Sequence, residues 1–159
     1  MDQISRLIAR WKSHGISCTA GVSPDEIIAF ESRRNVSFPS DLRSYFLAVN
    51  GMGEFGTCDE DLFCFWPIDH VKTIAAQVPD RCSLFCDAEA YFIIADHSIC
   101  LPSYAIRLSR DPAEANPVAS VFTDFGALKV ENFFCSFTDF INNYLDDPFK
   151  TSVALPSNI

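Results

Sequence analysis

Two stretches of the sequence contain residues whose types and spacing could carry chemistry. Residues 51–56 read Gly-Met-Gly-Glu-Phe-Gly, which is the G-x-G-x-x-G spacing of a dinucleotide-binding loop. That loop holds a pyrophosphate only where a strand precedes it and a helix N-terminus follows it. Here a helical pattern precedes it, and the Asp-Glu-Asp run at 59–61 would repel phosphate. We therefore predict no nucleotide cofactor.

The second stretch is the Asp96-His97 pair, which could act as an oriented acid and base, with Cys100 three residues beyond the histidine. No other group completes an arrangement of nucleophile, base and oxyanion donors, so this stretch is expected to be packed and not catalytic. The acidic run lacks the alternating ligands, central glycine and closing glutamate of a calcium loop. His14 and His70 are isolated in the sequence. We predict no metal site and no enzyme activity.

Composition indicates one domain with an aromatic-rich core. The chain has 159 residues, of which 48% are hydrophobic and 15 are Phe. Seven cysteines form no CxxC pair, so we expect reduced thiols, with Cys64, Cys100 and Cys135 packed as small apolar groups. No apolar run has the length of a membrane span, and the N-terminus lacks the apolar block of a signal peptide. These features predict a cytoplasmic protein.

Charge excludes one class of partner. The chain carries 21 acidic and 12 basic residues, a net charge of -9, and residues 44–106 hold nine acidic side chains but only two basic ones. A field of this sign repels phosphate backbones, so we expect no nucleic-acid binding. Membrane binding is not expected either, because the short amphipathic segment at 2–13 is better explained as a helix docked on the domain than as a membrane-surface helix. Two interpretations of the acidity stay open: it forms a binding surface, or it only keeps the protein soluble.

The strongest local signals predict two helices joined by a turn. Ser23 can cap a helix with Pro24 at its first position and Glu26 completing a capping box, and Asn35 can end it. A second helix is expected to begin after Ser40. Its apolar face consists of Leu42, Tyr45, Phe46 and Val49, and the Asn50-Gly51 pair ends it.

The remaining pattern predicts an α+β fold. We expect a helix at 2–13 docked on the domain, a brief helix within 68–76, and a last helix opened by Ser136. The expected strands lie at 62–66, 90–95, 104–108, 118–122 and 128–134. Without crossover helices, the strands should form a mainly antiparallel sheet, with helices at the N-terminal side and a closing C-terminal helix. Residues 148–159 are expected to be a tail.

An ordered set of landmarks spans most of the chain. A glutamate near the end of a helix, a hydrophobic-Pro pair, an Asn-Gly pair and an apolar Trp-Pro segment follow one another: Glu31, Phe38, Pro39, Asn50, Gly51, Trp66 and Pro67. This set resembles the SUKH superfamily, the domain shared by fungal cell-wall-synthesis regulators and many bacterial toxin-immunity proteins. The resemblance covers about residues 20–147 and makes 1–159 a single SUKH-like domain.

The resemblance implies a protein-binding module, most often an immunity protein that neutralises a cognate toxin. Nuclease toxins present basic clefts that an acidic surface can occlude. The alternative is a regulatory or scaffolding domain that binds a cellular protein. We predict that the partner-binding acids are those around the central loop, which have no basic residue among them: Glu54, Asp59, Glu60, Asp61 and Asp69.

Glu31 is assigned a structural role. A carboxylate near the C-terminal end of a helix opposes the helix dipole and needs a compensating partner. The predicted partners are Arg34 and a backbone N-H of the link at 38–40.

Overall fold

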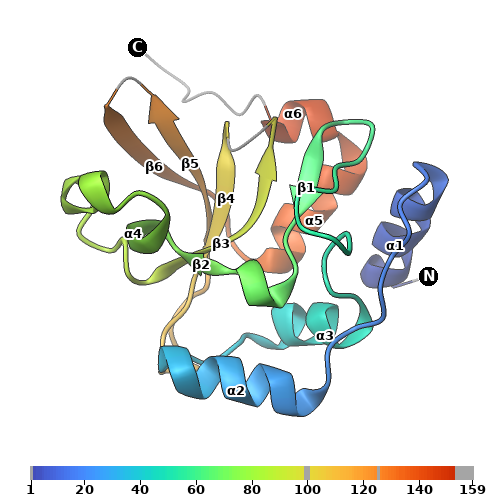
Figure 1. The fold of residues 1–159 in the computed structure, drawn as a ribbon, viewed down its shortest axis with the longest axis horizontal. Coiled ribbons are helices and arrows are strands. Elements are labelled where there is room, and N and C mark those ends of the chain that lie inside the picture. Colours follow the sequence, from blue (N-terminus) through green and yellow to red (C-terminus); the bar gives the residue numbers. More distant parts are fainter. Residues whose placement is uncertain (1, 99–100, 125, 153–159) are drawn as a thin grey trace.

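Three helices precede a six-stranded antiparallel sheet, and two further helices follow it, in a computed structural model that describes residues 2–98, 101–124 and 126–152 (Figure 1). The helices are α1 (Gln3–Ser13), α2 (Pro24–Arg34), α3 (Ser40–Ala48), α4 (Ile74–Gln77), α5 (Phe137–Asp146) and α6 (Pro148–Ser152), with 3-10 turns η1 (Ile68–His70) and η2 (Pro79–Leu84). The strands are β1 (Phe63–Phe65), β2 (Lys72–Thr73), β3 (Tyr91–His97), β4 (Ser103–Arg107), β5 (Val118–Asp124) and β6 (Ala127–Phe134). The predicted α+β class is confirmed.

The boundaries of α2 follow from its terminal residues. The Ser23 hydroxyl accepts a hydrogen bond from the Glu26 N-H at 3.3 Å, and the Glu26 carboxylate accepts one from the Ser23 N-H at 2.8 Å, which is the predicted capping box. The backbone hydrogen bond from Ser23 lowers the pKa of Glu26. Asn35 ends the helix in the left-handed conformation, as predicted.

The sheet is ordered β1-β3-β4-β5-β6, and β2 also pairs with β3. All of these pairs are antiparallel. The segment 68–76, for which we predicted one brief helix, instead forms η1, then β2, then the start of α4. Its extended part is stabilised by pairing with β3, a tertiary contact that the local pattern does not reveal.

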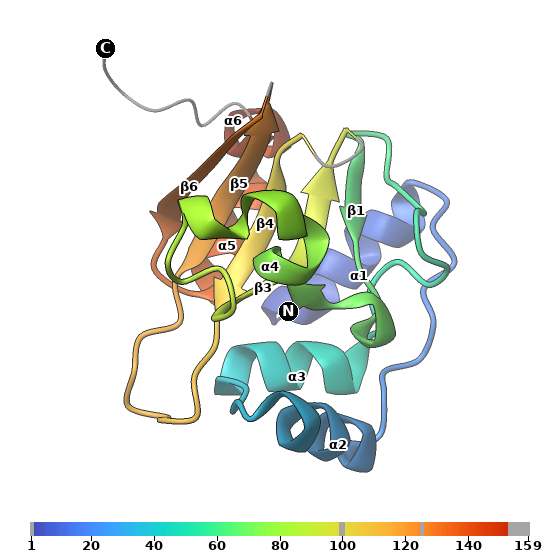
Figure 2. The same ribbon diagram turned by 60° about the vertical axis from the view of Figure 1, so that its left-hand side comes forward.

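Helices cover both faces of the sheet, and strand β3 buries apolar side chains on both sides. Phe92 and Ile94 of β3 belong to the larger core, which also contains residues of α1, α2, α3 and α5. Tyr91 and Ile93 of the same strand belong to a smaller core with Ile74 of α4. Figure 2 shows α4 in front of the sheet and α1 and α5 behind it. Burial on both faces explains why the first five residues of β3, Tyr91–Ala95, are all apolar.

Helices α1 and α5 pack against each other. Leu7 and Trp11 of α1 are fully buried, and the Trp11 indole N-H donates to the Tyr144 hydroxyl of α5 at 3.1 Å. Residues 148–152, expected to belong to a tail, form α6 because Asp147 caps the turn by accepting from the Lys150 N-H at 2.9 Å. The rest of that tail, 153–159, lies outside the described residues. None of the described helices has the length and apolar character needed to cross a membrane.

Candidate functional site

The loop between α3 and β1, residues 50–62, carries most of the predicted binding acids and is anchored at its start by the Asn-Gly pair. The Asn50 side-chain oxygen accepts from the Ile68 N-H at 2.8 Å, and the Met52 N-H donates to the Phe65 carbonyl at 3.0 Å. Gly51 has φ +61°, and a Cβ there would lie 2.6 Å from the Phe65 carbonyl oxygen. Only glycine allows this approach.

Glu31 holds the link between α2 and α3. Its carboxylate accepts from the Phe38 N-H at 2.6 Å and from the Arg43 guanidinium at 2.5 Å, and its side chain is 14% exposed. The predicted bond to the backbone of the link is present. The ionic partner is Arg43 and not Arg34, because α3 returns along α2 and places a cation beside the carboxylate.

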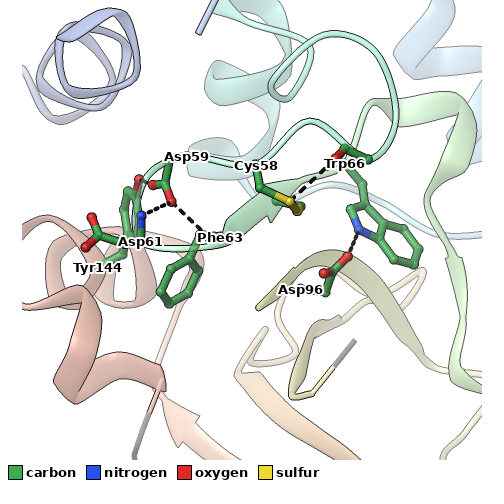
Figure 3. Close-up of a disulfide and its surroundings, with 9 residues drawn as sticks. Cys58, Asp59, Asp61, Phe63, Trp66, Asp96 and Tyr144 are labelled. Atoms are coloured by element: carbon green, nitrogen blue, oxygen red, sulfur yellow. Dashed lines mark hydrogen bonds between the residues drawn. A yellow bond between two sulfur atoms is a disulfide. The ribbon is translucent and has the colours of Figure 1, made fainter. Parts of the chain in front are cut away.

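The remaining landmark residues also have structural contacts. Phe38 is buried, with its ring centroid 5.3 Å from that of Phe30, and Pro39 is the residue that precedes α3. Trp66 is 1% exposed and donates its indole N-H to Asp96 at 2.5 Å, while Pro67 precedes η1 (Figure 3). Asp96, considered above as an acid-base partner of His97, thus accepts a hydrogen bond from a buried tryptophan. Cys100 lies outside the described residues.

The structure separates the five predicted binding acids into two surface sites and one buried group. Glu54 and Asp69 line one pocket, here called the Glu54 pocket, and Glu60 and Asp61 line another, here called the Leu62 groove. Asp59 lies beneath the loop and is 4% exposed. Sequence spacing placed all five on one surface, but the loop turns between them.

Asp59 is a buried hydrogen-bond acceptor. One carboxylate oxygen accepts from the Asp61 N-H at 3.0 Å and from the Phe63 N-H at 2.9 Å, and the other accepts from the Tyr144 hydroxyl (Figure 3). Burial, together with this carboxylate, raises the pKa of Tyr144. Asp59 therefore shapes the loop from within, and its own oxygens do not face a partner.

Asp61 has a basic neighbour that the sequence pattern did not indicate. Arg10 of α1 donates to its carboxylate at 2.5 Å, and the guanidinium also lies 5.2 Å from the centre of the Tyr144 ring. The side chain of Asp61 remains 40% exposed. Arg10 is 51 residues distant in sequence, so only the docking of α1 brings it to the loop.

The Glu54 pocket combines carboxylates with a stacked pair of rings. Phe55 and His70 are parallel, with centroids 4.2 Å apart, and the His70 ring nitrogen lies 3.0 Å from the Asp69 carboxylate. The pocket is also lined by Asn50. A positively charged side chain would be attracted by this arrangement, both by the acids and by the aromatic face.

One group of side chains has atoms close enough to hold a metal ion within the described part of the chain. Atoms of His14, Asp59 and Asp61 lie within 4.8 Å of one another. His14 is thus not isolated in space, as it is in the sequence. However, Asp59 already accepts from three donors, and Arg10 is paired with Asp61. Because these contacts compensate the carboxylates, we assign the group no metal.

Two features of this region were not expected. Cys58 and Cys64 form a disulfide that closes the acidic loop, whereas we predicted reduced thiols (Figure 3). The chain reverses between these cysteines, and their Cα atoms lie 4.3 Å apart. Cys135, predicted to be packed, is exposed. The Leu62 groove was also missed, although the apolar Phe149 in a segment assigned to a tail was a signal for it.

The comparisons with known proteins agree with the landmarks. The model of the SMI1 / KNR4 family (SUKH-1) matches residues 21–143. A search of curated proteins found no match. The matched range covers α2 to most of α5 and includes every landmark residue, the acidic loop and the whole sheet.

Proposed function

We propose, from the premise that this chain belongs to the SMI1 / KNR4 family (SUKH-1), that it is a non-catalytic protein-binding module that neutralises a cognate toxin by occlusion. Members of this family bind partner proteins, either toxins or regulators. The family match is the observation that carries the proposal. The net charge of -9 supports a basic partner, such as the cleft of a nuclease toxin.

We further propose that the partner contacts the exposed acids of the two surface sites. Glu54, Glu60 and Asp69 are exposed, and Asp61 is partly exposed beside Arg10. These carboxylates would lie opposite basic residues of the toxin and hold it without changing it chemically. A stable interface of this kind buries about 1,200 to 2,000 Å² in total. Asp59 contributes by fixing the loop.

The test is a titration of a candidate cognate toxin domain, sought first in the genes that neighbour this one. Occlusion predicts that toxin activity falls linearly and disappears near equimolar binding protein. Association should slow as salt rises, because exposed charges are screened beyond about 8 Å at physiological ionic strength, whereas dissociation should change less. Inhibition at far below equimolar amounts, or a covalently altered toxin, would show an enzyme instead.

A charge-neutralised variant tests the surface separately. Replacing the four surface acids by Asn or Gln should slow association with the toxin. The matched control neutralises four exposed acids outside the loop, Asp25, Asp80, Asp87 and Glu89, and changes net charge equally. An equal decrease in the association rate of both variants would mean that only overall charge matters, and the acidic surface would then be a solubility feature.

The same family match supports a second function, that of a regulatory domain binding a cellular protein. A toxin gene beside this one favours the first function. Capture of one cellular protein, abolished by the four surface substitutions and kept by the control variant, would favour the second.

A further inference from the structure

The Leu62 groove is lined by an unusual share of exposed apolar side chains. Seven large hydrophobic residues are exposed in the described part of the chain, and three of them line this one groove: Leu62 (54% exposed), Leu101 (54%) and Phe149 (77%). They come from the loop before β1, the segment before β4, and α6, which meet at the upper end of the molecule in Figures 1 and 2. Contiguous exposed apolar surface on a small protein is typical of an interaction site.

The backbone presents Leu62 in a fixed direction. Its φ is +65°, a left-handed conformation that is uncommon for a bulky residue. Hydrogen bonds hold both sides of the residue, since its N-H donates to the Asp59 carbonyl and its carbonyl accepts from the Ser98 N-H, each at 3.0 Å. Within the isolated chain, an exposed leucine gains no burial energy that would offset this conformation. Such strained positions are often found at functional sites.

The charges around the groove indicate the chemistry of its occupant. Glu60 is exposed at its edge and Asp61 is partly exposed, whereas no lysine or arginine is among the lining residues. Arg10 is already paired with Asp61. His97 lines the groove, with its ring centroid 4.8 Å from that of Phe63. An apolar side chain flanked by cations would match both the floor and the edge.

We propose that the Leu62 groove is the docking site for an apolar anchor residue of a basic protein partner, a leucine or aromatic side chain flanked by lysine or arginine. This inference rests on the proposed function and adds to it where the partner is anchored and by which side chain. The groove, about 450 Å³ in volume, accepts one such side chain between Leu62, Leu101 and Phe149. The acids then steer the partner, and the apolar contact retains it.

The test uses three synthetic hexapeptides and the full chain labelled with nitrogen-15. The first peptide is Lys-Arg-Leu-Phe-Arg-Lys, the second replaces its apolar pair with Ser-Gly, and the third replaces its four cations with Glu. We expect saturable amide shifts at Leu62, His97 and Ser152 with the first peptide, and binding weaker by about tenfold or more with the other two. Equal binding of the first two peptides would overturn the proposal, as would shifts confined to the Glu54 pocket or no saturable shifts.

A substitution separates docking from folding. Leu62→Asn removes the apolar side chain and tolerates the left-handed conformation, so the melting temperature should not fall while peptide affinity drops about tenfold. Leu84→Ser, at a leucine that is 60% exposed on η2, is the matched control and should bind normally. Unchanged affinity of Leu62→Asn would exclude the groove as the anchor site.

The toxin titration distinguishes the two proposals. If wild type and Leu62→Asn neutralise the toxin with the same dissociation rate, the proposed function stands and the groove proposal fails. If the peptide binds the groove but the wild-type protein does not inhibit the toxin, the groove proposal stands and toxin neutralisation fails.

Discussion

Replacing Asp59 should destabilise the fold strongly, although the residue lies in an acidic surface loop. Asp59→Ala leaves the Asp61 and Phe63 N-H groups and the Tyr144 hydroxyl without their acceptor. An unsatisfied buried donor costs about 1 to 3 kcal/mol, and the Asp61 N-H is only partly buried, so we expect a loss of about 4 kcal/mol for the three donors. Asp59→Asn keeps an oxygen for the two N-H donors and should lose only about 1 to 2 kcal/mol.

The assay is urea unfolding followed by tryptophan fluorescence. With a slope of about 2 kcal/mol per M, the midpoint of Asp59→Ala should fall by about 2 M. Asp61→Asn is the matched control, because a partly exposed ion pair contributes only about 0 to 1 kcal/mol. The reasoning is refuted if Asp59→Ala unfolds within about 0.5 kcal/mol of wild type, or if the Asn and Ala variants lose equal stability.

Three further predictions concern Glu31, Gly51 and Tyr144. Glu31→Ala should lose about 2 to 3 kcal/mol in urea unfolding, because it leaves a backbone N-H and a guanidinium without their acceptor, and partner affinity per folded molecule should not change. A stable Glu31→Ala protein that no longer binds would contradict the structural role. Gly51→Ala should lose about 3 kcal/mol from strain and from contact with a carbonyl oxygen 2.6 Å away, whereas Gly56→Ala, with φ +91° and no atom within 4 Å, should lose only about 1 kcal/mol. Equal losses would show that conformation and not contact limits position 51. Burial first, and then the Asp59 carboxylate, raise the pKa of Tyr144 above its ordinary value of 10.0 in the folded state. The unfolded protein therefore loses this proton at a lower pH than the folded protein does, and the free energy of unfolding should fall as pH rises beyond about 10. Tyr144→Phe should show a shallower fall between about pH 9 and pH 11 in the same assay, and an unchanged slope would argue against this linkage.

The sequence correctly predicted the helix ends that are stabilised by residues only a few positions apart. The capping box of α2, the left-handed Asn35 and the Ser136 cap of α5 are formed by residues a few positions apart, and each was identified from the sequence. The strand at Lys72–Thr73 was not identified from the sequence, because this segment is extended only through its pairing with β3. Long-range pairing overrides the weak preference of so short a segment.

The role of the acidic loop as a binding site stays a prediction, and the sequence did not predict how its side chains are arranged. Acidity and spacing identified the loop, but they could not show that Asp59 turns inward or that Arg10 reaches Asp61 from a helix 51 residues away. The same limit applies to Glu31, whose cation comes from α3 and not from its own helix. Side-chain contacts between distant segments depend on how the helices dock. Hydrophobic periodicity shows which face of a helix is buried, but not which individual residues of two docked segments touch.

The Tyr144 hydroxyl links residues outside the family match to the loop inside it. It accepts from Trp11 and donates to Asp59, so it connects the first helix and the last full helix to the acidic loop. The family match ends at residue 143 and begins at 21, which leaves both Trp11 and Tyr144 outside it. The cooperative unit is therefore longer than the evolutionary one. If α1 were removed, the Tyr144 hydroxyl would lose its Trp11 donor and Asp61 would lose its paired cation, Arg10. The charge that the loop presents therefore depends on a cation of α1, a helix that lies outside the family match.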